Sequence, residues 1–176
     1  LLLLLGLSLA AILVYLARIN SYVERHDRIT VPALVSATGM RQRIYEMTLL
    51  LHAFGESRSD VDRRAARDRL QRLDSEVRNA LAFYRATHAA GTHPVLLRML
   101  TRHGQTGLAD QEQRVLDETA ALLTVFETDW RAIAFPAGAA PEAKAGPTLR
   151  ETDAVARRLA DQLEALVNLH TRITAE

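Results

Sequence analysis

Two arginines within residues 36–47 are the side chains best suited to chemistry, because arginine binds anions through charge-assisted hydrogen bonds. Arg41 and Arg43 flank Gln42. On a helix, offsets of three and four residues define one face, and the face of Arg43 also carries Gly39, Met40, Met47 and Leu50. A guanidinium buried among apolar side chains without a counter-charge costs several kcal/mol. Arg43 therefore needs an acidic neighbour such as Glu46, access to solvent, or a bound anion.

The same segment resembles a family of bacterial receptors. Residues 39–47 read Gly-Met-Arg-Gln-Arg-Ile-Tyr-Glu-Met, which is similar to the Ala-Gly-Arg-Gln-Arg-Met-Leu-Ser-Gln motif of the type IV pili chemotaxis transducer (PilJ-like) N-terminal domain. That domain is related to the periplasmic sensor of nitrate/nitrite histidine kinases of the NarX type. Residues 127–130, Glu-Thr-Asp-Trp, also resemble the Val-Glu-x-x-Trp element that these domains carry before their last helix.

The resemblance implies a ligand site at a dimer interface. In the nitrate sensors of this family, one motif arginine from each subunit holds the anion. Alignment on Arg-Gln-Arg gives this role to Arg43, with Arg41 beside it, and the apolar neighbours of Arg43 suit an interface. Alignment on the glycine gives the role to Gln42 instead. Gly39 would let the partner helix approach closely, so these four residues are the expected site for a small anionic ligand in a homodimer.

An uncharged segment at the start of the chain relates this motif to a membrane. Leu1 to Ala17 carry no charged side chain, and a spanning helix needs about 20 apolar residues. We expect residues 1–18 to be the end of a transmembrane anchor that begins upstream. Residues after about Arg18 would lie in the periplasm, held at a bacterial inner membrane. The alternative is a cleaved signal peptide, although no small-x-small cleavage site follows the apolar run.

Glycine and proline divide the remaining chain, residues 19–176, into amphipathic helices. We expect four of them, at about 19–54, 59–90, 109–135 and 149–174. Pro32 should bend or interrupt the first near Thr30. In the third, the expected buried stripe is Val115, Thr119, Leu122, Phe126, Trp130 and Ile133. Seven-residue steps favour near-parallel packing, so the predicted fold is all-α, an antiparallel up-down four-helix bundle that continues from the transmembrane helix.

Composition argues against several classes of function. The chain has 176 residues, a net charge of +1 and no cysteine, which disfavours a nucleic-acid partner, a disulfide and a thiolate metal site. The six histidines form no pair at metal-ligand spacing on one helix. There is no nucleophile motif, P-loop or dinucleotide-binding turn. We therefore expect no metal, no cofactor and no catalysis in this part of the protein.

Together these features predict an extracytoplasmic ligand-sensing domain of a bacterial transmembrane signalling receptor, of the histidine kinase (two-component) or chemoreceptor (chemotaxis) type. Its ligand would be a small oxyanion such as nitrate, bound at the dimer interface. The fourth helix would return the chain to the membrane, where a second spanning segment after Glu176 would lead to an output domain. The alternative is a membrane-anchored helical adaptor that binds another protein and has no small-molecule site.

Overall fold

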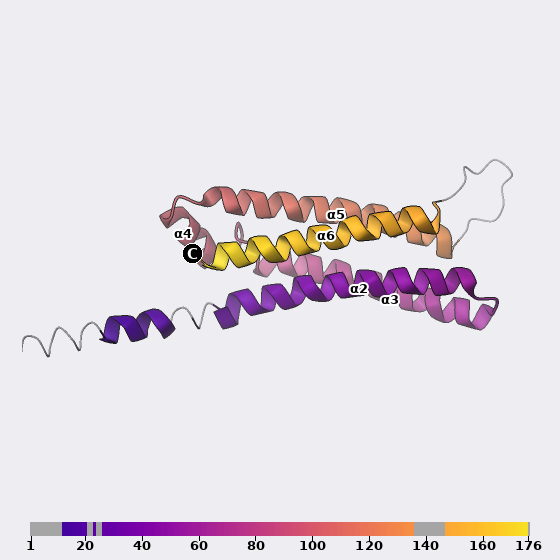
Figure 1. The fold of residues 1–176 in the computed structure, drawn as a ribbon, viewed down its shortest axis with the longest axis horizontal. Helices are drawn as coiled ribbons and strands as arrows, with labels where there is room; N and C mark the ends of the chain where they lie inside the picture. The colour runs from indigo at the N-terminus through magenta and orange to yellow at the C-terminus, as the bar shows by residue number, and fades with distance from the viewer. Residues whose placement is uncertain (1–11, 21–22, 24–25, 136–146, 176) are drawn as a thin grey trace, which may run out of the picture.

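The structure is a computed structural model that describes residues 12–20, 23, 26–135 and 147–175 (Figure 1). All regular secondary structure in these residues is helical, which confirms the all-α prediction. Residues 12–20 form a first helical segment. The labelled elements that follow are η1 His26–Thr30, α2 Val31–Glu56, α3 Asp60–Thr87, α4 Pro94–Arg102, α5 Thr106–Ala134 and α6 Leu149–Ala175.

The chain changes from one helix type to another where Pro32 is expected to interrupt it. η1, a short π-helix, ends at Thr30, and α2 begins at Val31 with Pro32 in its first turn. Proline disrupts a helix interior but is tolerated in a first turn, where its missing N–H has no intrahelical partner to lose. The predicted interruption near Thr30 is therefore seen as a change of helix type. Of the helix expected over 19–54, residues 19, 20, 23 and 31–54 are α-helical, and residues 21, 22, 24 and 25 lie outside the described part of the chain.

Side chains cap two of the long helices. Ser59 Oγ accepts a hydrogen bond from the backbone N–H of Asp62 at 3.3 Å, before α3. Before α6, Glu151 Oε2 accepts from the N–H of Thr148 at 2.7 Å, and Thr148 Oγ1 accepts from the N–H of Glu151 at 3.2 Å. This reciprocal pair is a capping box. It places the first residue of α6 at Leu149, the predicted start of the fourth helix.

Two predicted helix boundaries are wrong by about one turn. α3 ends at Thr87, before the predicted end of the second helix. α5 begins at Thr106 rather than at Ala109, so Gly107, expected in a loop, lies in its first turn. Gly104 separates α4 from α5 with a φ of 69°. Because glycine adopts this left-handed conformation without strain, the chain can turn there.

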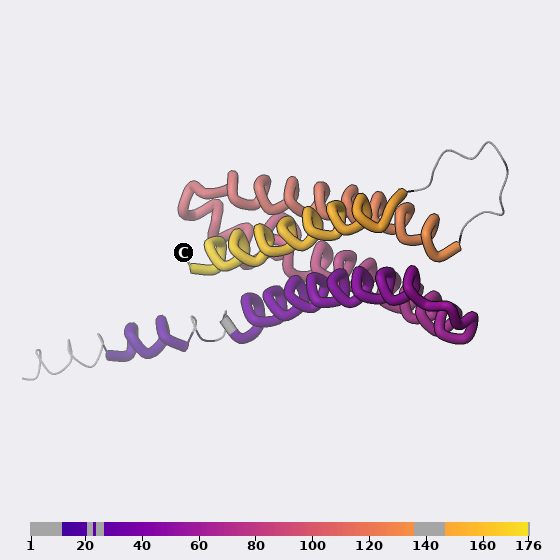
Figure 2. Tube along the Cα trace, turned by 45° about the vertical axis from the view of Figure 1, so that its right-hand side comes forward, coloured from indigo at the N-terminus to yellow at the C-terminus, as the bar shows by residue number. Residues whose placement is uncertain are grey.

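The four long helices α2, α3, α5 and α6 lie side by side, and successive ones run in opposite directions (Figure 1 and Figure 2). α2 packs closely against α3 and α6, and α5 packs closely against α6. α3 and α5 come close together at far fewer positions. Long side chains therefore have to bridge the space between these two helices.

The main apolar core lies between these four helices. Among its largest fully buried side chains are Trp130, Tyr84, Phe126, Met40, Ile44 and Met47. Burial of one large apolar side chain contributes about 1.5–3 kcal/mol. The long helices therefore hold one another through this shared core rather than through their individual helix propensities.

A second, smaller apolar cluster lies where η1, α4 and the C-terminal part of α6 meet. It includes Ile29 of η1, Leu96 and Leu100 of α4, and Leu169 and Ile173 of α6. These contacts attach the short elements to the end of the long helices where η1 leads into α2 and where α6 ends (Figure 1).

The predicted transmembrane anchor, residues 1–18, is described only from residue 12. Residues 12–20 are helical and exposed, whereas residues 1–11 lie outside the described part of the chain. Within the part that the structure describes, no helix has both the length and the apolar character required to cross a bilayer.

Candidate functional site

One face of α2 remains exposed along the helix. Its residues follow one another in alternating steps of four and three: Val31, Val35, Thr38, Gln42, Tyr45 and Leu49. Leu49 is 70% exposed and Val35 is 66% exposed. Alternating steps of four and three are typical of the seam between two packed helices. We call these six residues the exposed α2 face.

Arg41 and Arg43 lie on opposite edges of the exposed α2 face, because successive residues on a helix are about 100° apart. Arg41 Nη1 is 3.2 Å from Glu164 Oε2 of α6. Arg43 Nε donates to Glu76 Oε2 of α3 at 2.7 Å. Gln42 lies between the two arginines and is exposed. The structure thus brings the Arg-Gln-Arg motif to one surface, with an acid from a neighbouring helix beside each arginine.

The counter-charge of Arg43 is not the one that the sequence suggests. Glu46 pairs with Arg69 of α3 at 2.7 Å, and Glu76 takes the place expected for it. The hydrogen bond from Arg43 is the largest cause of the lowered pKa of Glu76. Arg43 is also 37% exposed. It therefore has two of the three forms of compensation considered above, an acidic partner and contact with solvent.

The apolar neighbours of Arg43 face the interior of their own chain. Met40 and Met47 are fully buried in the main core. The expectation that these side chains line a subunit interface beside Arg43 is therefore wrong. A partner helix could reach this part of α2 only through the exposed face and its two edges.

Gly39 lies one turn before Arg43 and leaves room for its side chain. A Cβ atom at Gly39 would be 2.9 Å from Nη1 of Arg43. Helical side chains point back toward the helix N-terminus, so the guanidinium of Arg43 passes over this position. A contact within one chain therefore explains why glycine is suited to this position. The expected role of Gly39 in the approach of a partner helix stays a prediction.

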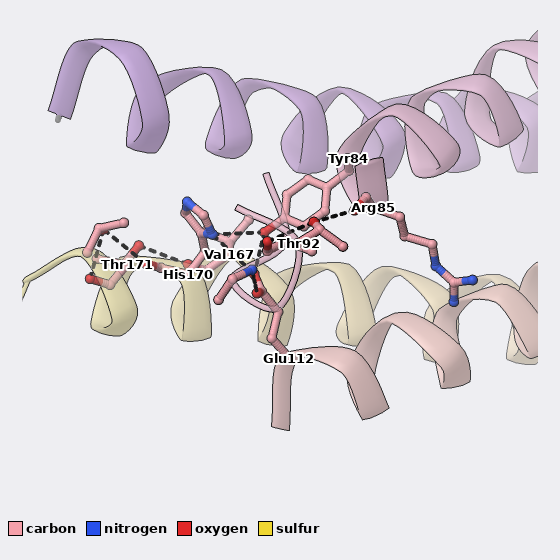
Figure 3. Close-up of polar contacts among 10 residues, drawn as sticks. Tyr84, Arg85, Thr92, Glu112, Val167, His170 and Thr171 are labelled. Atoms are coloured by element: carbon pink, nitrogen blue, oxygen red, sulfur yellow. Dashed lines mark hydrogen bonds and ion pairs between the residues drawn. The ribbon is translucent and has the colours of Figure 1, made fainter. Parts of the chain in front are cut away.

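A second group of polar side chains, which the sequence analysis does not predict, is buried between α3, α5 and α6 (Figure 3). Glu112 Oε1 accepts a hydrogen bond from Tyr84 Oη at 2.9 Å and lies 3.1 Å from His170 Nδ1. Glu112 Oε2 accepts from the backbone N–H of Ala90 at 2.5 Å. Tyr84 Oη and His170 Nδ1 are 3.1 Å apart. We call Tyr84, Glu112 and His170 the buried polar cluster.

The buried polar cluster was missed because the stripe predicted for the third helix is rotated. Val115, Leu122 and Ile133 of that stripe are only partly buried. The residues that α5 buries are Ala109, Glu112, Leu116, Thr119, Leu123, Phe126, Trp130 and Ala134. Steps of three and four from Ala109 place Glu112 in the core. A glutamate at a position that is otherwise occupied by apolar, buried residues is the signal that could have revealed the cluster.

Ion pairs cross the wider space between α3 and α5. Asp74 is buried, accepts from Arg78 Nη2 at 3.1 Å and lies 3.7 Å from Arg131. Glu127 pairs with the same two arginines. A groove of about 240 Å³ beside them is lined by Arg78, Leu81, Ala82, Arg85, Ala120, Leu123, Thr124 and Glu127. Arg78 and Arg85, the two arginines that line the groove, already form ion pairs with carboxylates. The groove therefore offers little unpaired charge to a ligand.

The two polar sites can do different chemistry. The Arg-Gln-Arg surface has exposed donors that can bind an anion. The buried polar cluster can exchange protons or hold elements together, but it is closed to solvent. Among the described residues, no group of histidine, aspartate and glutamate side chains is arranged to hold a metal ion.

Comparison of the chain with protein-family models, curated proteins and solved structures finds no match. The likeness of residues 39–47 to the PilJ-like motif therefore stays a resemblance. A function for this chain has to be argued from its own residues and their geometry.

Proposed function

We propose that this chain is the extracytoplasmic ligand-sensing domain of a bacterial transmembrane signalling receptor, folded as an antiparallel four-helix bundle and active as a homodimer. The observation that carries the proposal is the position of the two ends of the helical body. Ile29 of η1 belongs to the same apolar cluster as Leu169 and Ile173 of α6. A domain whose chain enters and leaves at one end can stand on a membrane and transmit a displacement through both connections.

The arrangement of the long helices supports the bundle. α2, α3, α5 and α6 share one apolar core and alternate in direction (Figure 2). α4 is short and connects α3 to α5 at the end where the chain enters and leaves. In such a bundle α2 and α6 carry the two connections, so a shift of α2 against α6 is the motion that a receptor of this kind would transmit.

The exposed α2 face supports a homodimer. Its alternating steps of four and three match a helix–helix seam, and it carries Val35 and Leu49 in largely exposed positions. Thr38 and Gln42 in its middle can form hydrogen bonds with a second copy. Two α2 helices packed on this face would bring the edge residues of both copies, including Arg43, next to the interface.

A small oxyanion such as nitrate is the ligand that this interface would suit. Arg43 side chains from two copies repel each other, and an anion between them would accept hydrogen bonds from both. Glu76 of the same chain competes for Arg43, because it already occupies the guanidinium Nε. Binding would signal only if the anion favours one arrangement of the paired α2 helices over another.

Calorimetry of the whole chain with sodium nitrate tests this assignment. Arg43→Ala should abolish binding, since it removes the donor. Glu76→Gln should strengthen binding several-fold, because it keeps the side-chain shape and removes the competing charge. Arg64→Ala, which removes an exposed arginine from α3, is the matched control and should bind as the wild type does.

Binding that survives Arg43→Ala, or that Glu76→Gln leaves unchanged, would contradict the role of Arg43. The same titration with nitrite, phosphate and acetate would define which class of anion is accepted. Planar anions should bind better than tetrahedral ones if the arginines form a flat, two-sided site.

The alternative is an adaptor whose exposed α2 face binds another protein. One observation favours it: both Arg41 and Arg43 already have acidic partners within the chain, so neither needs an anion. In that case no small anion should bind at all, and Leu49→Glu should abolish binding of the partner protein while the fold is retained.

A further inference from the structure

The buried polar cluster joins four parts of the chain that are far apart in sequence. Glu112 belongs to α5, Tyr84 to α3 and His170 to α6 (Figure 3). Ala90, whose N–H bonds to Glu112, lies in the turn between α3 and α4. The α3–α5 pair otherwise approaches closely at few positions. Arg85 of α3 also donates to the backbone O of Leu116 in α5 at 2.7 Å. Glu112 is the acceptor that links α3, α5 and the α3–α4 turn inside the core.

The carboxylate of Glu112 is fully buried but well supplied with donors. Burial of an unpaired carboxylate costs several kcal/mol, and hydrogen bonds to the charged form offset that cost. Burial and the nearby Glu112 raise the pKa of Tyr84, so its hydroxyl keeps its proton and remains a donor. The other two groups that hydrogen-bond to the carboxylate are the Ala90 N–H and His170 Nδ1.

Two more histidines border the cluster. The His88 ring lies edge-on to the Tyr84 ring, with 5.8 Å between centroids, and the His170 ring lies similarly at 5.9 Å. His93 forms the N-cap of α4. His88 Nε2, His93 Nδ1 and His170 Nε2 are buried and have no hydrogen-bond partner. A proton added to any of these nitrogens would therefore be buried without an acceptor.

We propose that Glu112, Tyr84 and His170, with His88 and His93 beside them, form an acid-sensitive latch that holds the α3–α4 turn on α5 and α6 at neutral pH and releases it when the surroundings become acidic. The latch needs neither the anion site nor a dimer, so it does not depend on the sensing function proposed above. The latch lies at the end of the molecule where η1 packs against α6. Its release would detach α4 from η1 and from the C-terminal part of α6.

The titratable groups that act on the latch come from three helices and one turn. α3 contributes Tyr84, α5 contributes Glu112, α6 contributes His170, and the turn between α3 and α4 contributes His88 and His93. α4 and η1 bury apolar side chains there, Leu96, Leu100 and Ile29. Their charged side chains that the structure describes are exposed, namely Asp27, Arg28, Arg98 and Arg102. Among the side chains that the structure describes, Glu112 is thus the only buried acid beside these imidazoles.

The direction of the pH effect follows from the histidines. Burial is the main cause of the lowered pKa of His88 and of His93, and repulsion from His170 lowers both further. In an opened state both imidazoles would titrate near the usual value of about 6.5. Below that pH the opened state gains protons that the closed state resists, so the closed state loses stability. Above it the closed state is fully favoured.

Hydrogen exchange of the Ala90 amide, followed by NMR on the whole chain, measures the latch directly. We expect its protection factor to fall about tenfold or more between about pH 7.5 and about pH 5.5. The amide of Ile44, buried in the main core, should change far less. If Ala90 stays equally protected at both pH values, or if both amides lose protection together, the latch proposal is overturned.

A variant pair identifies the groups responsible. In the double variant His88→Asn and His93→Asn, which replaces two of the three imidazoles by polar side chains that do not titrate, the fall in Ala90 protection should be much smaller than in the wild type. His103→Asn, which changes an exposed histidine, should keep the wild-type fall. If the double variant does not fold, His93→Asn alone should reduce the fall. A fall that persists in full in a folded variant would contradict the proposal.

Discussion

The Arg-Gln-Arg surface of α2 and the buried polar cluster both pair acids with bases across helices, but in opposite surroundings. Arg43 and Glu76 are 37% and 44% exposed, whereas His170 and Glu112 are 1% and 0% exposed. Water and salt screen an exposed pair, which contributes about 0–1 kcal/mol. Loss of one partner from a buried pair costs about 3–5 kcal/mol. The exposed pair can therefore exchange partners without unfolding, and the buried one holds the fold.

The largest effect should come from Glu112→Ala. The substitution leaves the Tyr84 hydroxyl, the Ala90 N–H and His170 without their acceptor, and it opens a cavity beside them. The free energy of unfolding should fall by about 3–5 kcal/mol, measured by urea denaturation near neutral pH. Glu118→Ala, an exposed change on the same helix, should stay within about 0.5 kcal/mol of the wild type. Equal stability of the two variants would remove the contrast between the regions.

An intermediate effect on stability is expected from a substitution on the buried side of α2, and almost none from one on its exposed side. Met47→Glu places a carboxyl group in the main core, where Met47 is fully buried, so the free energy of unfolding should fall by about 2–3 kcal/mol. Leu49→Glu lies on the exposed α2 face and should leave stability nearly unchanged. It should instead shift a dimer toward monomer in sedimentation. A Leu49→Glu variant that is as dimeric as the wild type would exclude this face as the subunit interface.

The smallest effect on stability should come from Arg43→Ala. This variant breaks an exposed ion pair with Glu76, and the free energy of unfolding should fall by less than about 1 kcal/mol. Thermal unfolding at low and at high salt provides the measurement, because added salt should make the difference smaller still. A loss as large as that of Glu112→Ala would mean that Arg43 holds the fold and is not free to bind a ligand.

The sequence predicted most of the helices because their signals are local. Glycine and proline mark the breaks, and apolar spacing marks the faces, so Pro32 near the start of α2 and Leu149 at the start of α6 were placed correctly. The start of α5 was less accurate, since Gly107 is tolerated within a first turn. A glycine alone does not show whether a helix starts before or after it.

The candidate sites were predicted less well because they depend on pairs across helices. The sequence identified Arg41 and Arg43, but it could not show that Glu164 and Glu76 are their partners. It placed Met47 beside a partner subunit, whereas Met47 lies in the core of its own chain. Both points depend on how far α2 is rotated toward α3 and α6, and no local spacing fixes that rotation.

The amino-acid sequence by itself determined that the chain is helical, where its long helices break, and which arginines could meet an anion, because periodicity and turn residues act over a few neighbours. Only the tertiary structure decided which acids neutralise those arginines and which face of α2 stays open. It also brought Tyr84, Glu112 and His170 together. Such contacts join residues far apart in the chain, and they form only when a shared apolar core sets the rotation of each helix.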